Sequence, residues 1–139
     1  MAVARFHLIS SLSPSEALAV LTDFGPARAR NWPTIEHLEV HAIGDNWAEV
    51  TEGTASAWER ARYEWDAAQG RVTITTHESK VFGPGGGWIF QLTPEGDGTR
   101  IDIELTRTPR TLKGKMIAAL LPVIATSLRK SYREPLKAR

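Results

Sequence analysis

Five side chains between residues 49 and 77 could take part in proton transfer: Glu49, Glu52, Glu59, Tyr63 and His77. A carboxylate or an imidazole accepts a proton and a phenol donates one, so a pair of these groups in a dry cavity could catalyse a cyclisation or a dehydration. The simpler interpretation is that each is a solvated or ion-paired residue on a strand. His77 lies opposite the apolar side of its expected strand, which predicts that it points to solvent.

Glu52 is the most informative of these residues. It shares one side of an expected strand with Ala48 and Val50, so it points toward apolar surroundings if that side is buried. A buried, unpaired carboxylate is costly. Glu52 would therefore need a partner such as Arg60 or Arg62, or a raised pKa.

The chain is rich in tryptophan, with five in 139 residues. Trp58, Tyr63, Trp65 and Trp88 fall in expected strands beside charged neighbours. Such rings either line a slot for a flat or apolar ligand, with their N–H and O–H groups fixing its orientation, or fill the core. Tyr63 and Trp65 share one side of their strand, and Glu59 lies on that side too unless a bulge intervenes. The sequence leaves open which side faces inward.

The sequence lacks the residues that several other kinds of site would need. The chain contains no cysteine, which excludes disulfides, thiolate metal sites and cysteine catalysis. His37 and His41 are four residues apart, but in a strand this spacing separates them by about 13 Å, too far for one metal ion. The run from Gly83 to Gly87 lacks the lysine and the following helix of a phosphate-binding loop, and it is more typical of a bend or a bulge. We therefore expect no metal and no cofactor.

Hydrophobic periodicity predicts the order strand, two short helices, six strands and one long helix. Ser13, Pro14 and Glu16 form the pattern of a helix N-terminus with a capping box. The predicted strands occupy 3–10, 35–43, 47–53, 57–66, 71–78, 87–94 and 99–107. The first predicted helix begins at Pro14, the second covers 27–31, and the third runs from Thr111 to about Leu136. Short gaps with turn residues separate the last six strands, which is typical of an antiparallel meander with one apolar face.

The last predicted helix is the element that must cover this apolar face. One of its sides carries residues spaced three and four apart, and we expect this side to meet the sheet: Leu112, Met116, Leu120, Val123, Ser127 and Leu128. Pro122 lacks an N–H group and should kink the helix. The apolar run from Met116 to Ala125 is too short for a bilayer, which takes about 20 residues, so we expect no stable membrane insertion.

Length and composition are those of one globular domain, residues 1–139. The net charge is +1, but residues 110–139 hold eight Lys or Arg and one acidic residue, Glu134. Stacking aromatic residues are not interleaved with these charges, so we interpret them as a solvated helix end and expect no nucleic-acid partner. The N-terminus has no signal-peptide pattern, which predicts a cytoplasmic protein. No pattern predicts the oligomeric state.

Several short motifs carry a resemblance to a known family. They are Ala19–Phe24 followed by Trp32-Pro33 and Ile35, Trp58–Trp65, Gly98–Ile101, and Thr108-Pro109-Arg110 leading to Leu112–Lys115. With this order of elements, the chain resembles the bacterial polyketide cyclase/dehydrase and lipid-transport branch of the START-related (SRPBCC) superfamily. The resemblance implies an α+β helix-grip fold: a curved, seven-stranded antiparallel sheet wrapped around the long C-terminal helix, with two short helices after the first strand. It also implies a cavity for an apolar or aromatic small molecule, but no catalytic residues, because the superfamily shares a pocket and no common reaction.

We therefore expect a carrier or sensor that binds a hydrophobic or aromatic small molecule, lipid or polyketide-like, between the sheet and the C-terminal helix. The expected lining residues are Trp32, Tyr63, Trp65, Trp88, Phe90, Ile103, Met116 and Leu120, with Trp32 near the cavity mouth. The alternative is a cofactor-free polyketide cyclase or dehydratase that uses a cavity carboxylate as general base. Its candidate catalytic residues are Glu52, Glu59 and Tyr63.

Overall fold

The computed structural model describes residues 2–32 and 34–138, and in this part of the chain it contains seven strands and three helices. The elements are β1 (Ala2–Ser10), α1 (Pro14–Leu21), α2 (Ala27–Asn31), β2 (His37–Ile43), β3 (Trp47–Gly53), β4 (Trp58–Asp66), β5 (Arg71–Ser79), β6 (Phe82–Glu95), β7 (Gly98–Pro109) and α3 (Leu112–Arg133). The predicted order of elements is confirmed. Pro33 lies outside the described residues, so the expected extended chain at Trp32-Pro33 can be checked only at Trp32, whose backbone is extended.

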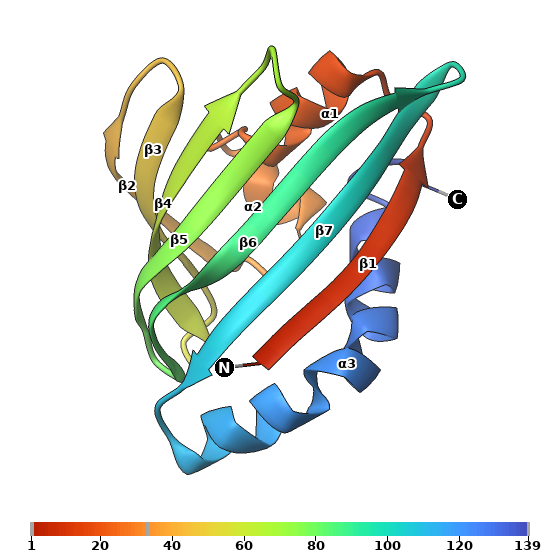
Figure 1. Ribbon diagram of the computed structural model, residues 1–139. Coiled ribbons are helices and arrows are strands. Elements are labelled where there is room, and N and C mark those ends of the chain that lie inside the picture. The colour runs from red at the N-terminus through yellow and green to blue at the C-terminus, as the bar shows by residue number, and fades with distance from the viewer. Residues whose placement is uncertain (1, 33, 139) are drawn as a thin grey trace.

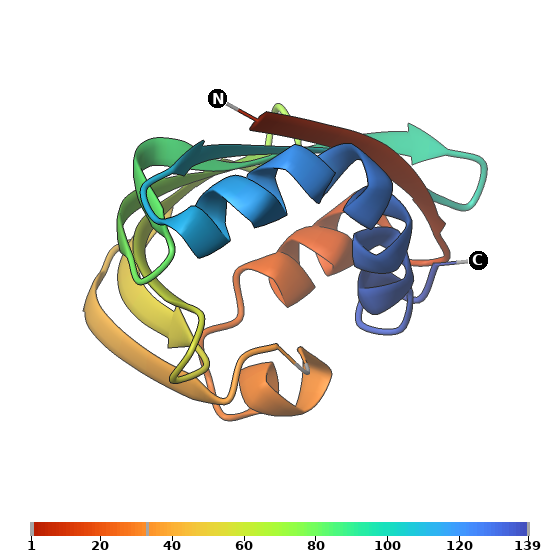
Figure 2. The same ribbon diagram turned by 90° about the horizontal axis from the view of Figure 1, so that it is seen from below.

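All the strands belong to one antiparallel sheet with the order β1-β7-β6-β5-β4-β3-β2. The strands β2 to β7 are neighbours in both sequence and sheet, and β1 joins the meander beside β7. The sheet is strongly curved, and α1 and α2 lie on its concave side (Figures 1 and 2). This arrangement is the predicted helix-grip architecture.

The main core fills the space between the concave face and the helices. Its sheet residues alternate along the strands, as Ala48 and Val50 do in β3. From α1 come Ala17 and Leu21, both buried, and from the end of the chain comes the fully buried Leu136. The C-terminal segment is held to the end of β1, because the backbone N–H group of Ser11 donates to the carbonyl oxygen of Lys137 at 3.0 Å.

The glycine run at 83–87 forms the first part of β6. The pairing of β6 with β7 shifts between Gly83 and Gly87, which confirms the predicted bulge or bend. A β-carbon at Gly87 would overlap the carbonyl oxygen of Ile74 on the neighbouring strand. Glycine is therefore required there, because the two backbones approach too closely for any side chain.

The helix α3 contradicts one prediction. Its side with Leu112, Met116, Leu120 and Val123 is exposed by 53 to 76%, so the expectation that these residues meet the sheet was wrong. Leu128, predicted on the same side, is partly buried and packs against the small core cluster that includes Leu121 and residues of β1 and β7. The buried residues are instead Gly114, Ala118 and Leu121.

Two features of α3 explain why the other side is buried. The helix runs past the end of the sheet at which β7 finishes, bends about midway and turns back alongside β1 (Figures 1 and 2). Pro122 in the helix interior accounts for the predicted kink. A β-carbon at Gly114 would lie 2.5 Å from the carbonyl oxygen of Val81, so the helix approaches the chain before β6 on a side where only a small residue fits.

No helix in the described residues is both long and apolar enough to cross a membrane.

Candidate functional site

A cavity of about 200 Å³ lies on the concave side of the sheet. One part of its wall is apolar and largely aromatic, and the other part is charged. The apolar part consists of Leu21, Trp32, Ile35, Trp58, Tyr63, Val72, Ile74, Val81, Phe82, Trp88, Phe90 and Tyr132; the polar part consists of Arg28, Thr34, Glu52, Glu59, Ser79 and Arg107, and Gly53 and Ala57 complete the lining.

Four of the lining residues named from the sequence are in this wall: Trp32, Tyr63, Trp88 and Phe90. Strands β4 and β6 supply three of them, because alternate residues of these strands face the concave side. Trp32 follows α2 and is buried, 6% exposed, at the edge of the core. Contact of these residues with a ligand stays a prediction.

The other four do not line the cavity. Trp65 lies beside Phe24, with ring centroids 6.2 Å apart, and Ile103 is 2% exposed within the core. Met116 and Leu120 are 63% and 53% exposed on the outer side of α3, so their assignment to the cavity was wrong. The bend in α3 and the burial of its small residues turn both side chains away from the sheet.

Tyr132 is a wall residue that the sequence reasoning missed. Its ring lies 5.0 Å from that of Trp32, 5.6 Å from Trp88 and 6.1 Å from Phe90, measured between centroids. A signal was present: Ala118, Leu121, Ala125, Leu128 and Tyr132 recur at alternating three- and four-residue steps. This competing stripe is the one that α3 turns toward the protein.

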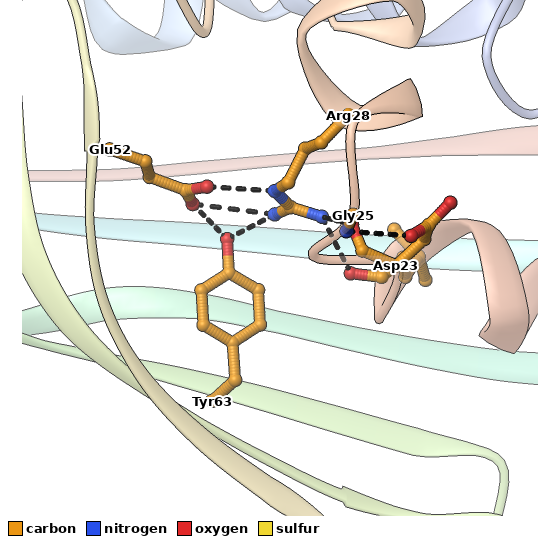
Figure 3. Close-up of polar contacts among 6 residues, drawn as sticks. Asp23, Gly25, Arg28, Glu52 and Tyr63 are labelled. Atoms are coloured by element: carbon orange, nitrogen blue, oxygen red, sulfur yellow. Dashed lines mark hydrogen bonds and ion pairs between the residues drawn. The ribbon is translucent and has the colours of Figure 1, made fainter. Parts of the chain in front are cut away.

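Arg28 and Glu52, from the polar part of the wall, form a buried cluster with the hydroxyl group of Tyr63 (Figure 3). The Arg28 Nε atom donates to Glu52 Oε2 at 2.8 Å, and Nη2 donates to the Tyr63 hydroxyl at 2.7 Å and to Glu52 Oε1 at 3.4 Å. The Tyr63 hydroxyl in turn donates to Glu52 Oε1. Nη1 donates to the backbone carbonyls of Leu21 and Asp23 at 3.2 and 3.1 Å, which fixes the guanidinium between α1 and the sheet.

Burial and charge act together on this cluster. Burial, followed by the neighbouring charge of Glu52, raises the pKa of Tyr63 well above its ordinary value, so the phenol stays protonated and remains a donor. Burial by itself would lower the pKa of Arg28, but the interactions with Tyr63 and Glu52 outweigh it, and the net pKa is raised. Arg28 is therefore a permanent cation within the protein.

The predicted partners of Glu52 were wrong. Arg60 lies 3.8 Å from Glu78, and Arg62 donates to Glu49 at 2.9 Å, so both arginines are on the other side of the sheet. The actual partner, Arg28, is 24 residues before Glu52 and no local pattern distinguishes it from Arg30. The ion pair forms only because α2 docks against the concave face.

Glu59 belongs to a second polar cluster in the same cavity. Its Oε2 atom accepts hydrogen bonds from Arg107 Nη1 at 2.9 Å and from the Thr76 hydroxyl at 2.8 Å. The side chains of Arg107 and Glu59 are 11% and 16% exposed. The register of β4 and β5 skips His77, so the extra residue is in β5, and Glu59 keeps the inward direction of Tyr63. His77 itself is exposed, as predicted.

The three candidate catalytic residues, Glu52, Glu59 and Tyr63, thus meet in one cavity, each bonded to an arginine. Glu49 is part of the Arg62 ion pair and does not line the cavity. The described residues contain no cluster of histidine, aspartate and glutamate that could hold a metal ion.

The curved sheet, the enclosing helices and the cavity between them define a helix-grip fold, and solved structures share it. A START superfamily protein from Mycobacterium smegmatis is similar with a TM-score of 0.80 and 14% identity, over 99% of this chain and 98% of that one. A protein from Thermus thermophilus is similar with a TM-score of 0.77 and 21% identity, over 97% of both chains. The Zhui aromatase/cyclase from Streptomyces sp. R1128 is similar with a TM-score of 0.70 and 13% identity, over 97% of this chain and 84% of that one. No protein-family model and no curated protein sequence matches the chain.

Proposed function

We propose that the protein binds a hydrophobic or aromatic small molecule in the cavity and acts as its carrier or sensor. The observation that carries this proposal is the aromatic wall of Trp32, Trp88, Phe90 and Tyr132 inside the sheet. The Trp88 and Phe90 rings lie nearly parallel, at 14° and 6.0 Å between centroids, which suits a flat ligand.

The energy needed for binding comes from apolar area alone. Burying about 300 Å² of ligand and wall at about 25 cal/mol per Å² contributes roughly 7 kcal/mol before association costs. This allows a dissociation constant of about 10 µM or weaker without any specialised residue. The similarity in fold to a START superfamily protein supports the same proposal.

Paired charges favour binding over turnover. Each cavity carboxylate already accepts hydrogen bonds from an arginine, Glu52 from Arg28 and Glu59 from Arg107. A general base must be able to accept a proton from the substrate in the transition state. Here both oxygens of Glu52, and Oε2 of Glu59, already accept hydrogen bonds from groups that are fixed in the protein.

The second candidate is a cyclase or dehydratase, and one observation favours it. Glu52 and Tyr63 form a hydrogen-bonded carboxylate–phenol pair in the cavity. Such a pair could remove a proton from a carbon next to a ketone and donate a hydrogen bond to the oxyanion that develops. The similarity in fold to an aromatase/cyclase agrees with this candidate.

The binding proposal is tested with N-phenyl-1-naphthylamine, an uncharged fluorescent probe. Three tryptophans line the cavity, so excitation of tryptophan should yield probe emission by energy transfer, and this emission should saturate as the probe concentration rises. Freshly purified protein should also retain a small molecule in native mass spectrometry. Saturable probe binding that leaves tryptophan emission unchanged would contradict this cavity as the site.

The two candidates are separated by Glu52→Gln and Glu59→Gln, tested with a linear poly-β-ketone thioester. The carrier proposal predicts that the wild type binds this compound and returns it unchanged. Turnover by the wild type that either substitution abolishes, with binding retained, would instead establish the enzyme.

A further inference from the structure

Tyr132 stands near the C-terminal end of α3 with its ring enclosed by other aromatic rings. Trp32 contacts it edge to face, Trp88 and Phe90 flank it from β6, and Phe6 lies 6.1 Å away on β1. A ring held by four aromatic neighbours has one orientation, so its hydroxyl is fixed in space as well.

This hydroxyl differs from the other polar groups of the cavity wall. Within residues 2–32 and 34–138, every fully buried side-chain nitrogen and oxygen has a hydrogen-bond partner, whereas the Tyr132 hydroxyl makes no hydrogen bond. It therefore borders open space, and Tyr132 lines the cavity. Burial is the main cause that raises the pKa of Tyr132, so the phenol stays protonated and remains a donor. The Tyr63 hydroxyl, in contrast, is bonded to Arg28 and Glu52.

The charges around the cavity select against an ionic ligand. Arg28 is paired with Glu52, and Arg107 with Glu59, so each pair is neutral by itself. A ligand carboxylate or ammonium group would lose its hydration without gaining an unpaired counter-ion, which is costly. An uncharged ligand avoids this cost.

A ligand that fills the cavity removes water from the Tyr132 O–H donor, and a desolvated donor without an acceptor is costly. An uncharged ligand that carries an acceptor oxygen avoids this cost. We infer that the Tyr132 hydroxyl donates a hydrogen bond to an acceptor oxygen, such as a ketone carbonyl, of an uncharged, flat aromatic ligand. This inference rests on the proposed binding function and names the ligand class and the residue that selects it.

The test compares 1-tetralone with tetralin, which has the same bicyclic skeleton without the carbonyl oxygen. Isothermal titration calorimetry gives the ratio of their dissociation constants for the wild type, for Tyr132→Phe and for Ser131→Ala. Tyr132→Phe removes only the hydroxyl and keeps the enclosed ring. Ser131→Ala is the matched control, because it removes an exposed hydroxyl from the adjacent position on α3. A third ligand, 5,6,7,8-tetrahydro-2-naphthoate, tests the charge.

We expect the preference for tetralone over tetralin to fall about fivefold in Tyr132→Phe, equivalent to about 1 kcal/mol for one hydrogen bond. Tetralin affinity in this variant and the ratio in Ser131→Ala should stay unchanged, and the carboxylate should bind more weakly than tetralin. An unchanged ratio in Tyr132→Phe, with both compounds bound, would refute the anchoring role and leave the binding function intact. Binding of neither compound to the wild type would contradict the proposed function and the anchor together.

Discussion

Replacement of Arg28 by leucine should strongly destabilise the protein. The side chain is 4% exposed and makes three hydrogen bonds to Glu52 and Tyr63 and two to backbone carbonyls. Its removal leaves the Glu52 carboxylate buried without a counter-ion. Breaking a buried ion pair in this way costs about 3–5 kcal/mol of unfolding free energy.

A surface pair provides the matched control. Arg5 and Glu104 lie 3.0 Å apart, close to the 2.8 Å of Arg28 and Glu52, but the Arg5 side chain is 71% exposed. Arg5→Leu should therefore cost no more than about 1 kcal/mol. Urea unfolding at pH 7, followed by tryptophan fluorescence, measures both variants.

A double substitution separates charge from packing. Arg28→Leu with Glu52→Leu leaves no unpaired buried charge, so its cost should be smaller than the sum of the two single costs by about 1–3 kcal/mol. The reasoning is refuted if Arg28→Leu costs no more than Arg5→Leu, or if the Arg28 and Glu52 costs simply add.

Three further predictions concern the buried face of α3, the cap of α1 and the two tyrosines. Leu120→Asp should change the melting temperature little because Leu120 is 53% exposed, whereas Leu121→Asp, at a position 3% exposed, should cost more than about 3 kcal/mol. Ser13→Ala removes the side-chain cap of α1 and should cost about 1 kcal/mol in urea unfolding. The protein's two tyrosines, Tyr63 and Tyr132, both have a raised pKa, so absorbance at 295 nm should show no tyrosinate near pH 10 while the fold persists.

The sign of the alkaline effect follows from proton binding. Unfolded tyrosine loses its proton near pH 10, while the folded protein still holds both protons. The free energy of unfolding should therefore keep its full value below about pH 10 and fall as the pH rises above it. Tyrosinate absorbance at pH 10 in the folded protein would contradict the raised pKa of the two tyrosines.

Equal melting temperatures for Leu120→Asp and Leu121→Asp would contradict the observed buried face of α3.

The order and type of the elements follow from local physical rules, and the sequence was sufficient for them. Period-two alternation, as in Ile101, Ile103 and Leu105, depends only on the pleat of a strand. The capping box of Ser13 and Glu16 joins residues three apart, and both of its hydrogen bonds are present. The bulge at 83–87 follows from consecutive glycines.

Part of the candidate site was also visible in the sequence. Trp88 and Phe90 were identified because strand alternation assigns them to the apolar side of the sheet, whereas for Tyr63 the sequence left open which side of its strand faces inward. Glu52 was identified as a carboxylate that would be buried if its side of the strand faced inward, and its need for a partner follows from the cost of an unpaired buried charge.

Two features are determined only by the tertiary structure. The first is the buried side of α3, where two apolar stripes compete; the close approach at Gly114 and the bend at Pro122 select the stripe that ends at Tyr132. The second is the partner of Glu52, because Arg28 reaches it only after α2 docks on the sheet. Periodicity describes how side chains are arranged on one element, but which groups meet depends on how separate elements pack, and that is set by the whole core.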